Sequence, residues 1–245
     1  MGIVLAPINI GIDIGKITDP TAISVAEVVQ AETGRFRSCK RVPAHLDKNG
    51  FFVEAKDAEP ILRTRFIIRQ IGRLKLGTSY PDVAIKIVDM LCHERFESRL
   101  IRLLVDVTGV GQAVFDMIKK EISDRIRGIN DLTLEQRERL RKLILLPISF
   151  VRGEKYNRSK GTLGKSFLVS KGQALLQNKR IDIPATAEAK ATCDELLVYE
   201  TRISESGSAT FGASTGKHDD LATALLLSVL IDPYAERVTH SERVY

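Results

Sequence analysis

The stretch NIGIDIGKITDP, Asn9–Pro20, places an acid in the middle of an apolar, β-branched run. The pattern over 8–14 predicts a buried strand. Because side chains alternate between the two faces of a strand, Ile12 and Ile14 point away from the face that carries Asp13. A carboxylate on that face requires a cation or hydrogen-bond donors. The stretch alone leaves two interpretations of Asp13, a functional acid or a residue that caps the following turn.

Outward from this strand, the chain continues in strand and helix patterns. The segments 8–14, 21–30 and 35–46 predict a three-stranded antiparallel meander, interrupted at Gly34. Further strands are expected at 63–76, 100–109, 144–151 and 180–184, and helices at 81–96, 111–122, 132–143, 171–178, 189–203 and 218–231. Thr133 and Gln136 match a capping box for the helix at 132–143. This order predicts an α/β fold with a mixed central sheet flanked by helices.

The composition is that of an ordinary globular protein with a modest basic bias. The 245 residues are 44% hydrophobic and 28% charged, and the net charge of +6 permits a polyanionic partner without requiring one. Three well-separated cysteines argue against a disulfide framework or a zinc cluster and fit a reducing cytoplasm. No apolar run approaches a membrane span, and no secretion signal is recognised, so no membrane partner is expected.

Two further elements end or begin with acids. Asp106 follows an apolar run in LLVDVTGVG, and Asp219 and Asp220 open the last helix. Acids in a first helical turn are also favoured by capping and by the helix dipole, so a structural role remains open for this pair. Clustered acids repel one another, and hard oxygen ligands select Mg²⁺ or Mn²⁺. We expect Asp13, Asp106, Asp219 and Asp220 to hold these ions.

Other candidates surround this acidic set. His218 precedes the acid pair and is expected to orient a ligand or a phosphate, or to cap the helix. Two motifs suggest ATP binding only weakly. GTLGKS, at 161–166, lacks the Walker A spacing. IGIDIG matches a phosphate loop of actin-like ATPases, but the glycine pair that holds adenosine in that fold is not recognised.

Basic residues form two groups. The segment 152–171 is Gly/Ser/Lys-rich and is expected to be a mobile basic loop that grips the DNA backbone or is simply solvated; its candidate DNA contacts are Arg152, Lys155, Arg158, Lys160, Lys165 and Lys171. A second set, Arg63, Arg65, Arg69 and Arg73, recurs at even spacing. It reads either as a basic stripe for phosphates or as an edge strand blunted by charge.

Taken together, these motifs resemble the nuclease domain of the large terminase subunit of tailed phages. The likeness rests on GIDIGKITDPTAISV, IGRLKLGTSYPDVAIKIVDML, LLVDVTGVGQAVFDMI, FLVSKGQALLQNKRIDIP and GASTGKHDDLATALLLSV, which occur in the family's order. It implies an RNase H-like fold and metal-dependent cutting of double-stranded DNA at the start and end of genome packaging, with two metal ions. By position, Asp13, Asp106 and the Asp219/Asp220 pair match the acidic cluster, and Asp19 matches a nearby supporting acid. Within the pair, the resemblance ranks Asp220 slightly ahead of Asp219 as a direct ligand.

The same resemblance sets expectations for organisation and partners. We expect one nuclease domain over 1–245, with a core at about 8–231, a polar tail at 232–245 and no ATPase domain. A packaging ATPase domain, the portal and the small terminase subunit are the expected protein partners, in the host cytoplasm. The helix at 132–143 has the character of an insertion without an assigned function.

Two other functional classes remain open at this stage. The chain could be a non-catalytic module that binds DNA or docks on a motor, with cutting dormant until assembly. It could also be another RNase H-like nuclease, such as a junction resolvase, which would prefer branched DNA.

Overall fold

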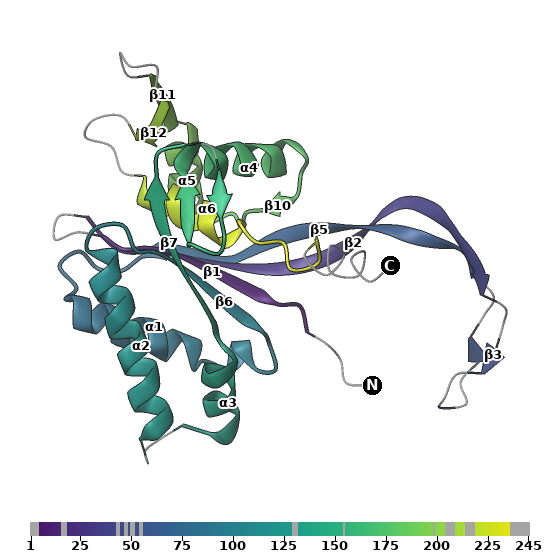
Figure 1. The fold of residues 1–245 in the computed structure, drawn as a ribbon, viewed down its shortest axis with the longest axis horizontal. Helices are drawn as coiled ribbons and strands as arrows, with labels where there is room; N and C mark the ends of the chain where they lie inside the picture. Colours follow the sequence, from purple (N-terminus) through teal and green to yellow (C-terminus); the bar gives the residue numbers. More distant parts are fainter. Residues whose placement is uncertain are drawn as a thin grey trace.

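A mixed eight-stranded sheet forms the centre of the molecule (Figure 1). The computed structural model describes residues 5–15, 19–42, 45–46, 49, 52–53, 56–128, 132–153, 155–197, 199–203, 209–213 and 219–235. The strands of this sheet, in spatial order, are β10 (Ile181–Asp182), β5 (Lys56–Arg73), β2 (Ala22–Val42), β1 (Ile8–Asp13), β6 (Ile101–Asp106), β7 (Ile144–Val151), β9 (Thr162–Gly164) and β8 (Tyr156–Asn157). The predicted α/β fold with a mixed sheet is therefore confirmed.

The register of the central strands brings the first two acids together. β1 runs antiparallel to β2 and parallel to β6, with Ile12 opposite Val105. Asp13 and Asp106 therefore end two adjacent parallel strands at the same edge of the sheet. Parallel strands need crossover connections, so this edge is where loops and helix ends can gather side chains.

Helices cover both faces of the sheet, so the sheet separates two hydrophobic cores (Figure 1). On one face lie α1 (Tyr80–Leu91), α2 (Gly111–Arg127) and α3 (Leu134–Lys142), packed against the isoleucines of β1. On the other lie α4 (Lys165–Gln177), α5 (Ala187–Leu197) and α6 (Asp220–Ser228). Ile10, Ile12 and Ile14 belong to the first core, as the alternation in the opening stretch predicts. A short 3-10 helix (Glu94–Phe96) follows α1, and β3 (His45–Leu46) pairs with β4 (Phe52–Val53).

Helix α6 lies directly on the central strand. Every residue from Asp220 to Ser228 is buried, which agrees with a helix that is apolar on nearly all sides. A Cβ at Gly11 would lie 2.1 Å from the carbonyl oxygen of Ala224, so only glycine allows this close approach. The first Gly of NIGIDIG thus fixes how near α6 comes to β1, on the face that carries Asp13.

The expected meander is wrong in its third strand. A single strand, β2, runs from Ala22 to Val42 and pairs with β5 rather than turning back near Gly34. Gly34 has φ of 72°, and the β2–β5 register shifts between Glu32 and Phe36. The glycine therefore accommodates an irregularity within one strand instead of a reversal. Figure 1 shows the resulting two-stranded ribbon extending well beyond the helices.

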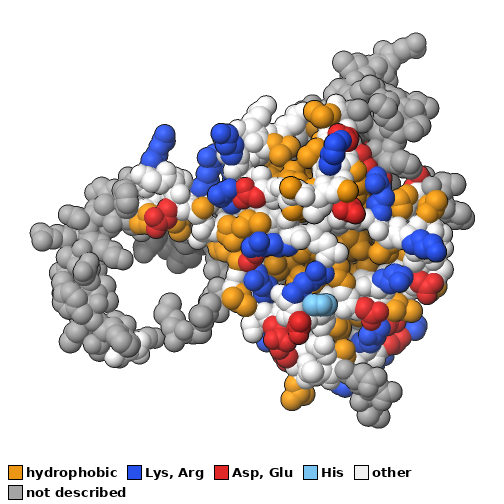
Figure 2. Space-filling model, turned by 180° about the vertical axis from the view of Figure 1, so that it is seen from behind, with side chains coloured by type: hydrophobic (Ala, Val, Ile, Leu, Met, Phe, Trp, Pro, Cys, Tyr) orange, Lys and Arg blue, Asp and Glu red, His pale blue; other side chains and the backbone are white. Residues whose placement is uncertain are grey.

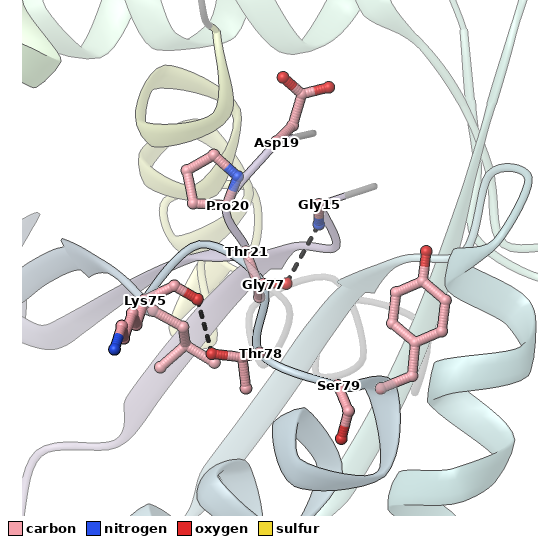
Figure 3. Close-up of a pocket in the computed structure, with 10 residues that line it drawn as sticks. Gly15, Asp19, Pro20, Thr21, Lys75, Gly77, Thr78 and Ser79 are labelled. Atoms are coloured by element: carbon pink, nitrogen blue, oxygen red, sulfur yellow. Dashed lines mark hydrogen bonds between the residues drawn. The ribbon is translucent and has the colours of Figure 1, made fainter. Parts of the chain in front are cut away.

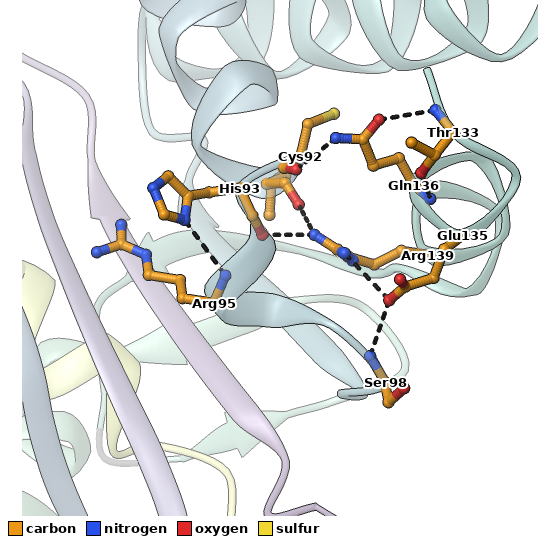
Figure 4. Close-up of polar contacts among 9 residues, drawn as sticks. Cys92, His93, Arg95, Ser98, Thr133, Glu135, Gln136 and Arg139 are labelled. Atoms are coloured by element: carbon orange, nitrogen blue, oxygen red, sulfur yellow. Dashed lines mark hydrogen bonds and ion pairs between the residues drawn. The ribbon is translucent and has the colours of Figure 1, made fainter.

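Helix α3, which the sequence marks as an insertion, caps the end of α1 (Figure 4). Both hydrogen bonds of the predicted capping box between Thr133 and Gln136 are present at the start of α3. Gln136 donates to the carbonyl of Cys92, and the buried Arg139 donates to the carbonyls of Leu91 and His93. Leu91 ends α1 and Cys92 and His93 follow it, so side chains of α3 supply donors to the carbonyls at this helix end, where the helix itself provides few. This gives the segment at 132–143 a structural role.

Two more segments differ from expectation. The predicted mobile basic loop contains β8 and β9, which form a small antiparallel pair at the sheet edge, and α4 begins at Lys165 rather than at Lys171. The predicted helix at 189–203 is α5 followed by β11 (Tyr199–Ile203), which pairs with β12 (Ala209–Ala213). None of the helices described is long and apolar enough to cross a membrane.

Candidate active site

The acids predicted from three separate elements line one cavity at the carboxyl edge of the sheet. Its volume is about 360 Å³, and its walls include Asp13, Asp19, Asp106, Lys165, Asp219 and Asp220, with the turn Thr108–Val110. Asp13 ends β1 and Asp106 ends β6, while Asp219 and Asp220 stand at the N-terminus of α6. The fold thus brings together residues that are more than 200 positions apart in the chain.

Asp106 is held in place by the turn that follows it. The backbone N–H of Thr108 donates to Asp106 Oδ1 at 2.8 Å, and Thr108 Oγ1 accepts from the backbone N–H of Phe150 on β7 at 2.9 Å. Burial raises the pKa of Asp106, and the hydrogen bond with Thr108 opposes that shift. The turn therefore orients the carboxylate of Asp106, which lines the cavity.

Asp13 is buried among like charges in the cavity. Burial raises its pKa well above the ordinary value for aspartate, and the negative charges of Asp106 and Asp219 raise it further. The ammonium of Lys165 lowers this pKa, but less than the other groups raise it. A surplus of negative charge around a buried carboxylate is the electrostatic situation that a cation relieves.

The two consecutive acids of α6 differ sharply in their partners. Asp219 is the N-cap residue, yet its side chain makes no capping hydrogen bond; its Oδ2 accepts from Lys165 Nζ at 3.0 Å. Asp220 has both oxygens engaged by Arg73, from Nε at 2.6 Å and from Nη2 at 3.0 Å. The side chain of Asp220 is 9% exposed and that of Asp219 is 29% exposed. The helix-cap interpretation therefore does not account for Asp219.

The carboxylates share the cavity without forming a tight cluster. Within the described part of the chain, no three His, Cys, Asp or Glu side chains are close enough together to hold a metal ion as they stand. Lys165 and Arg73 each draw one acid of α6 into an ion pair. The donor set nevertheless fits a hard divalent cation, because every acidic group that faces the cavity offers carboxylate oxygen.

A second cavity of about 320 Å³ adjoins the first and shares Gly15 and Asp19 with it. Its remaining walls come from Pro20 and Thr21 and from the segment that joins β5 to α1. Figure 3 shows Thr21 accepting a hydrogen bond from Gly15 and the hydroxyl of Thr78 donating to the carbonyl of Lys75. These bonds fix the loop that places Asp19 at the rim of both cavities.

The structure places the other predicted residues in different surroundings. Lys165 lies in the acid-lined cavity, whereas the ammonium of Lys171 donates to the carbonyl of Leu230, just after α6. His218 lies outside the described residues. The remaining basic candidates are exposed near β8 and β9, namely Arg152, Lys155, Arg158 and Lys160.

The predicted basic stripe is instead a row of paired arginines. Three of the four arginines of β5 form ion pairs, so much of their charge is compensated within the chain, and β10 pairs with β5 only at Phe66 and Ile67. Arg65 binds Asp182, Arg69 binds Glu27, and Arg73 binds Asp220, while Arg63 donates to the amide oxygen of Asn178. Figure 2 shows the face seen from behind, where basic side chains are scattered among acidic and apolar ones.

Sequence reasoning missed two residues next to the site. Glu195 of α5 is buried and contacts both Arg73 and the N-terminus of α6, and Thr108 orients Asp106. In the sequence, Arg73 stands out only as one member of the evenly spaced arginines of β5. No local pattern marks Glu195, because its partners are 122 and 27 residues away.

The comparisons with known proteins concern the fold. No family model matches the chain, and no curated protein matches it. Three solved structures of the large terminase nuclease from thermophilic phage G20c cover 91% of this chain. The form with bound cobalt gives a TM-score of 0.51 at 18% identity over 80% of that chain, and a second form gives 0.52 at 16% over 81%. The form with bound magnesium gives 0.50 at 20% over 80%. At this identity, the likeness shows that the chain shares this fold.

Proposed function

We propose that the chain is a divalent-metal-dependent endonuclease that cuts double-stranded DNA during viral genome packaging. The observation that supports this most is the cavity in which carboxylates from β1, β6 and α6 converge. It occurs in a chain that shares the fold of a phage large terminase nuclease whose solved forms include cobalt-bound and magnesium-bound ones. A packaging ATPase domain, the portal and the small terminase subunit are the protein partners we propose, in the host cytoplasm.

Asp13, Asp106 and Asp219 are the ligands we propose for two Mg²⁺ or Mn²⁺ ions. Asp13 and Asp106 end adjacent parallel strands, and Asp219 pairs with Lys165, whose place a metal ion could take. We place Asp220 behind Asp219 as a ligand because Arg73 engages both of its oxygens. Asp19, at the rim, and His218 are proposed as supporting residues. When bound, such ions would activate water for attack on the phosphodiester and stabilise the leaving oxygen.

The chain's own residues would position the DNA. Lys165 Nζ lies in the cavity, 3.0 Å from Asp219 Oδ2 and 5.6 Å from the centre of the Phe150 ring. When Asp219 binds a cation, the positive charge of this ammonium would attract a phosphate of the substrate. The exposed Arg152, Lys155, Arg158 and Lys160 would contact the backbone further along. Lys171 is the weakest of the candidates derived from the sequence, because its ammonium is bound to a carbonyl.

The test is plasmid cutting in Mn²⁺ or Mg²⁺, with and without EDTA. Asp13→Ala and Asp106→Ala should each abolish cutting, because each removes a carboxylate from the cavity. Asp116→Ala is the matched control, since Asp116 is an exposed aspartate of α2 that pairs with Lys119. Unchanged cutting by both cavity variants would refute the assignment.

One observation favours a dormant variant of this function. The two acids of α6 are paired with Lys165 and Arg73 rather than gathered with Asp13 and Asp106, as expected for a module that binds DNA or docks on a motor before it cuts. DNA binding that persists in EDTA, without nicking in any divalent metal, would support that alternative. A preference for branched over linear DNA would instead indicate a resolvase-like nuclease.

A further inference from the structure

Behind the cavity, the partly exposed Arg73 joins the buried side chains of Glu195 and Asp220 in a network at the start of α6. Arg73 ends β5, and the register pairs Arg73 with Ala22 on β2 and Ala22 with Asp13 on β1. Arg73 and Asp13 therefore lie in one row across three neighbouring strands. The small side chain of Ala22 between them, which is fully buried, leaves room for α6 on that face.

Arg73 binds two acids from two different helices. Its Nε and Nη2 contact both oxygens of Asp220 at the start of α6, and Nη2 also contacts Glu195 Oε1 on α5. The fork of a guanidinium matches a carboxylate in two parallel bonds, which fixes the direction of both groups. The hydrogen bond with Asp220 is the main cause of the raised pKa of Arg73.

Glu195 closes the network on the helix backbone. Its Oε2 accepts from the backbone N–H of Ala222 at 2.9 Å, in the first turn of α6, while its Oε1 contacts Arg73. The first N–H groups of a helix have no partner within the helix, so a buried carboxylate at this point anchors the helix end. The side chain of Glu195 is 9% exposed. The start of α6 is thus held at two points, the Asp220 side chain and the Ala222 amide.

We infer that Arg73 and Glu195 are positioning residues for the metal site, which act through Asp220 to set where Asp219 lies. Asp219 immediately precedes Asp220, so a rotation of the first turn of α6 would move its carboxylate relative to Asp13 and Asp106. The two consecutive acids then have separate roles: Asp220 fixes the start of α6, and Asp219 binds the metal ion. This inference rests on the proposed function, because it assumes a cation among Asp13, Asp106 and Asp219.

The experiment measures Mn²⁺ binding to the whole chain by electron paramagnetic resonance of the free ion, alongside thermal unfolding and plasmid cutting over a range of Mn²⁺ concentrations. Arg73→Gln should raise the Mn²⁺ Kd about tenfold or more, and its cutting should recover at high Mn²⁺. Arg73→Lys should give an intermediate Kd, because it keeps the charge but loses the fork. Glu195→Gln keeps one acceptor for Ala222 and should weaken Mn²⁺ binding less than Arg73→Gln.

Two further variants separate the acids. Asp219→Asn should abolish Mn²⁺ binding, whereas Asp220→Asn should only weaken it. The double variant Arg73→Gln/Asp220→Asn should bind Mn²⁺ no worse than the weaker of the two single variants, because both substitutions remove the same link. Arg69→Gln is the matched control, an ion-paired arginine of the same strand that contacts Glu27, and should leave the Mn²⁺ Kd unchanged.

The outcomes distinguish this inference from the function on which it rests. If folded Arg73→Gln binds Mn²⁺ like the unmodified chain, or if Asp220→Asn loses binding as completely as Asp219→Asn, the positioning role is overturned. If the unmodified chain binds no Mn²⁺ and cuts no DNA with any divalent metal, the proposed function itself fails.

Discussion

The two ends of β1 differ in which charge is in excess: acidic side chains at the carboxyl end and basic side chains near the amino end. At the carboxyl end, Asp13 and its acidic neighbours share a cavity in which Lys165 is the one lysine among the residues that the structure describes. Near the amino end, one carboxylate, Glu27 of β2, is shared by two arginines: Arg99 Nη1 contacts it at 2.6 Å and Arg69 Nε at 2.7 Å. Arg99 also donates to the backbone carbonyl of Ala6, which ties the start of the chain to this group.

The pKa shifts follow the same division. At the carboxyl end, burial and then neighbouring negative charge raise the pKa of Asp13. Burial also raises the pKa of Glu27, but the hydrogen bonds from Arg99 and Arg69 outweigh it, and the net shift is downward. An acid whose charge is compensated stabilises the fold, whereas acids gathered without enough cations store repulsion that a ligand can relieve. The difference between the two ends therefore separates a structural ion pair from a candidate site.

The largest expected contrast comes from adding metal. A ligand at 100 times its Kd stabilises the folded state by about 2.7 kcal/mol. Mn²⁺ at that excess should therefore raise the unfolding temperature of the chain and of Glu27→Gln alike, because the amino end takes no part in binding. Asp13→Asn should lose most of this stabilisation. Thermal unfolding with and without Mn²⁺ measures the effect, and an undiminished shift in Asp13→Asn contradicts the division between the two ends.

The next effect concerns the amino end alone. Glu27→Gln should lower the free energy of unfolding by about 2 kcal/mol, because two arginines lose a charged acceptor. Plasmid cutting per folded molecule should stay unchanged. Arg69→Gln is the milder control, since the Arg69 side chain is 58% exposed and its ion pair is screened by water. Urea unfolding gives the free energies, and a loss of cutting in folded Glu27→Gln would show that the two ends are coupled.

The smallest expected effect is the pH dependence of stability, because the two ends contribute slopes of opposite sign. Asp13 and Asp106 have raised pKa values in the folded state, so the folded chain keeps protons that the unfolded chain has released, and stability falls as pH rises through this window. Glu27 has a lowered pKa, so its contribution is present above the ordinary glutamate range and is lost as pH falls through the lowered value.

Urea unfolding over a pH series without divalent metal separates these slopes. Asp13→Asn should flatten the fall in stability above the ordinary aspartate range, and Glu27→Gln should flatten the rise on the acid side. The unmodified chain should show a shallow maximum between the two. If the free energy of unfolding of Asp13→Asn falls with pH as steeply as that of the unmodified chain, repulsion among the cavity acids is not the cause of the pH dependence.

Local patterns predicted the parts of the fold in which neighbours along the chain decide the structure. The alternation of isoleucines around Asp13 assigned the faces of β1 correctly, and the capping box of α3 is formed as predicted. The same reasoning misread Gly34 as a turn, because a positive φ serves a strand irregularity as well as a reversal. It also treated the arginines of β5 as one set, since spacing carries no information about the partner of each.

The sequence by itself determined that acids stand at the ends of a central strand, a second buried strand and a closing helix, since these are properties of short segments. Only the tertiary structure decided how Asp219 differs from Asp220. Arg73 meets Asp220 across 147 residues, and Lys165 meets Asp219 across 54. Two adjacent aspartates are chemically the same in a sequence. They differ in the folded chain because the packing of β5, α4 and α6 brings an arginine side chain to one and a lysine side chain to the other.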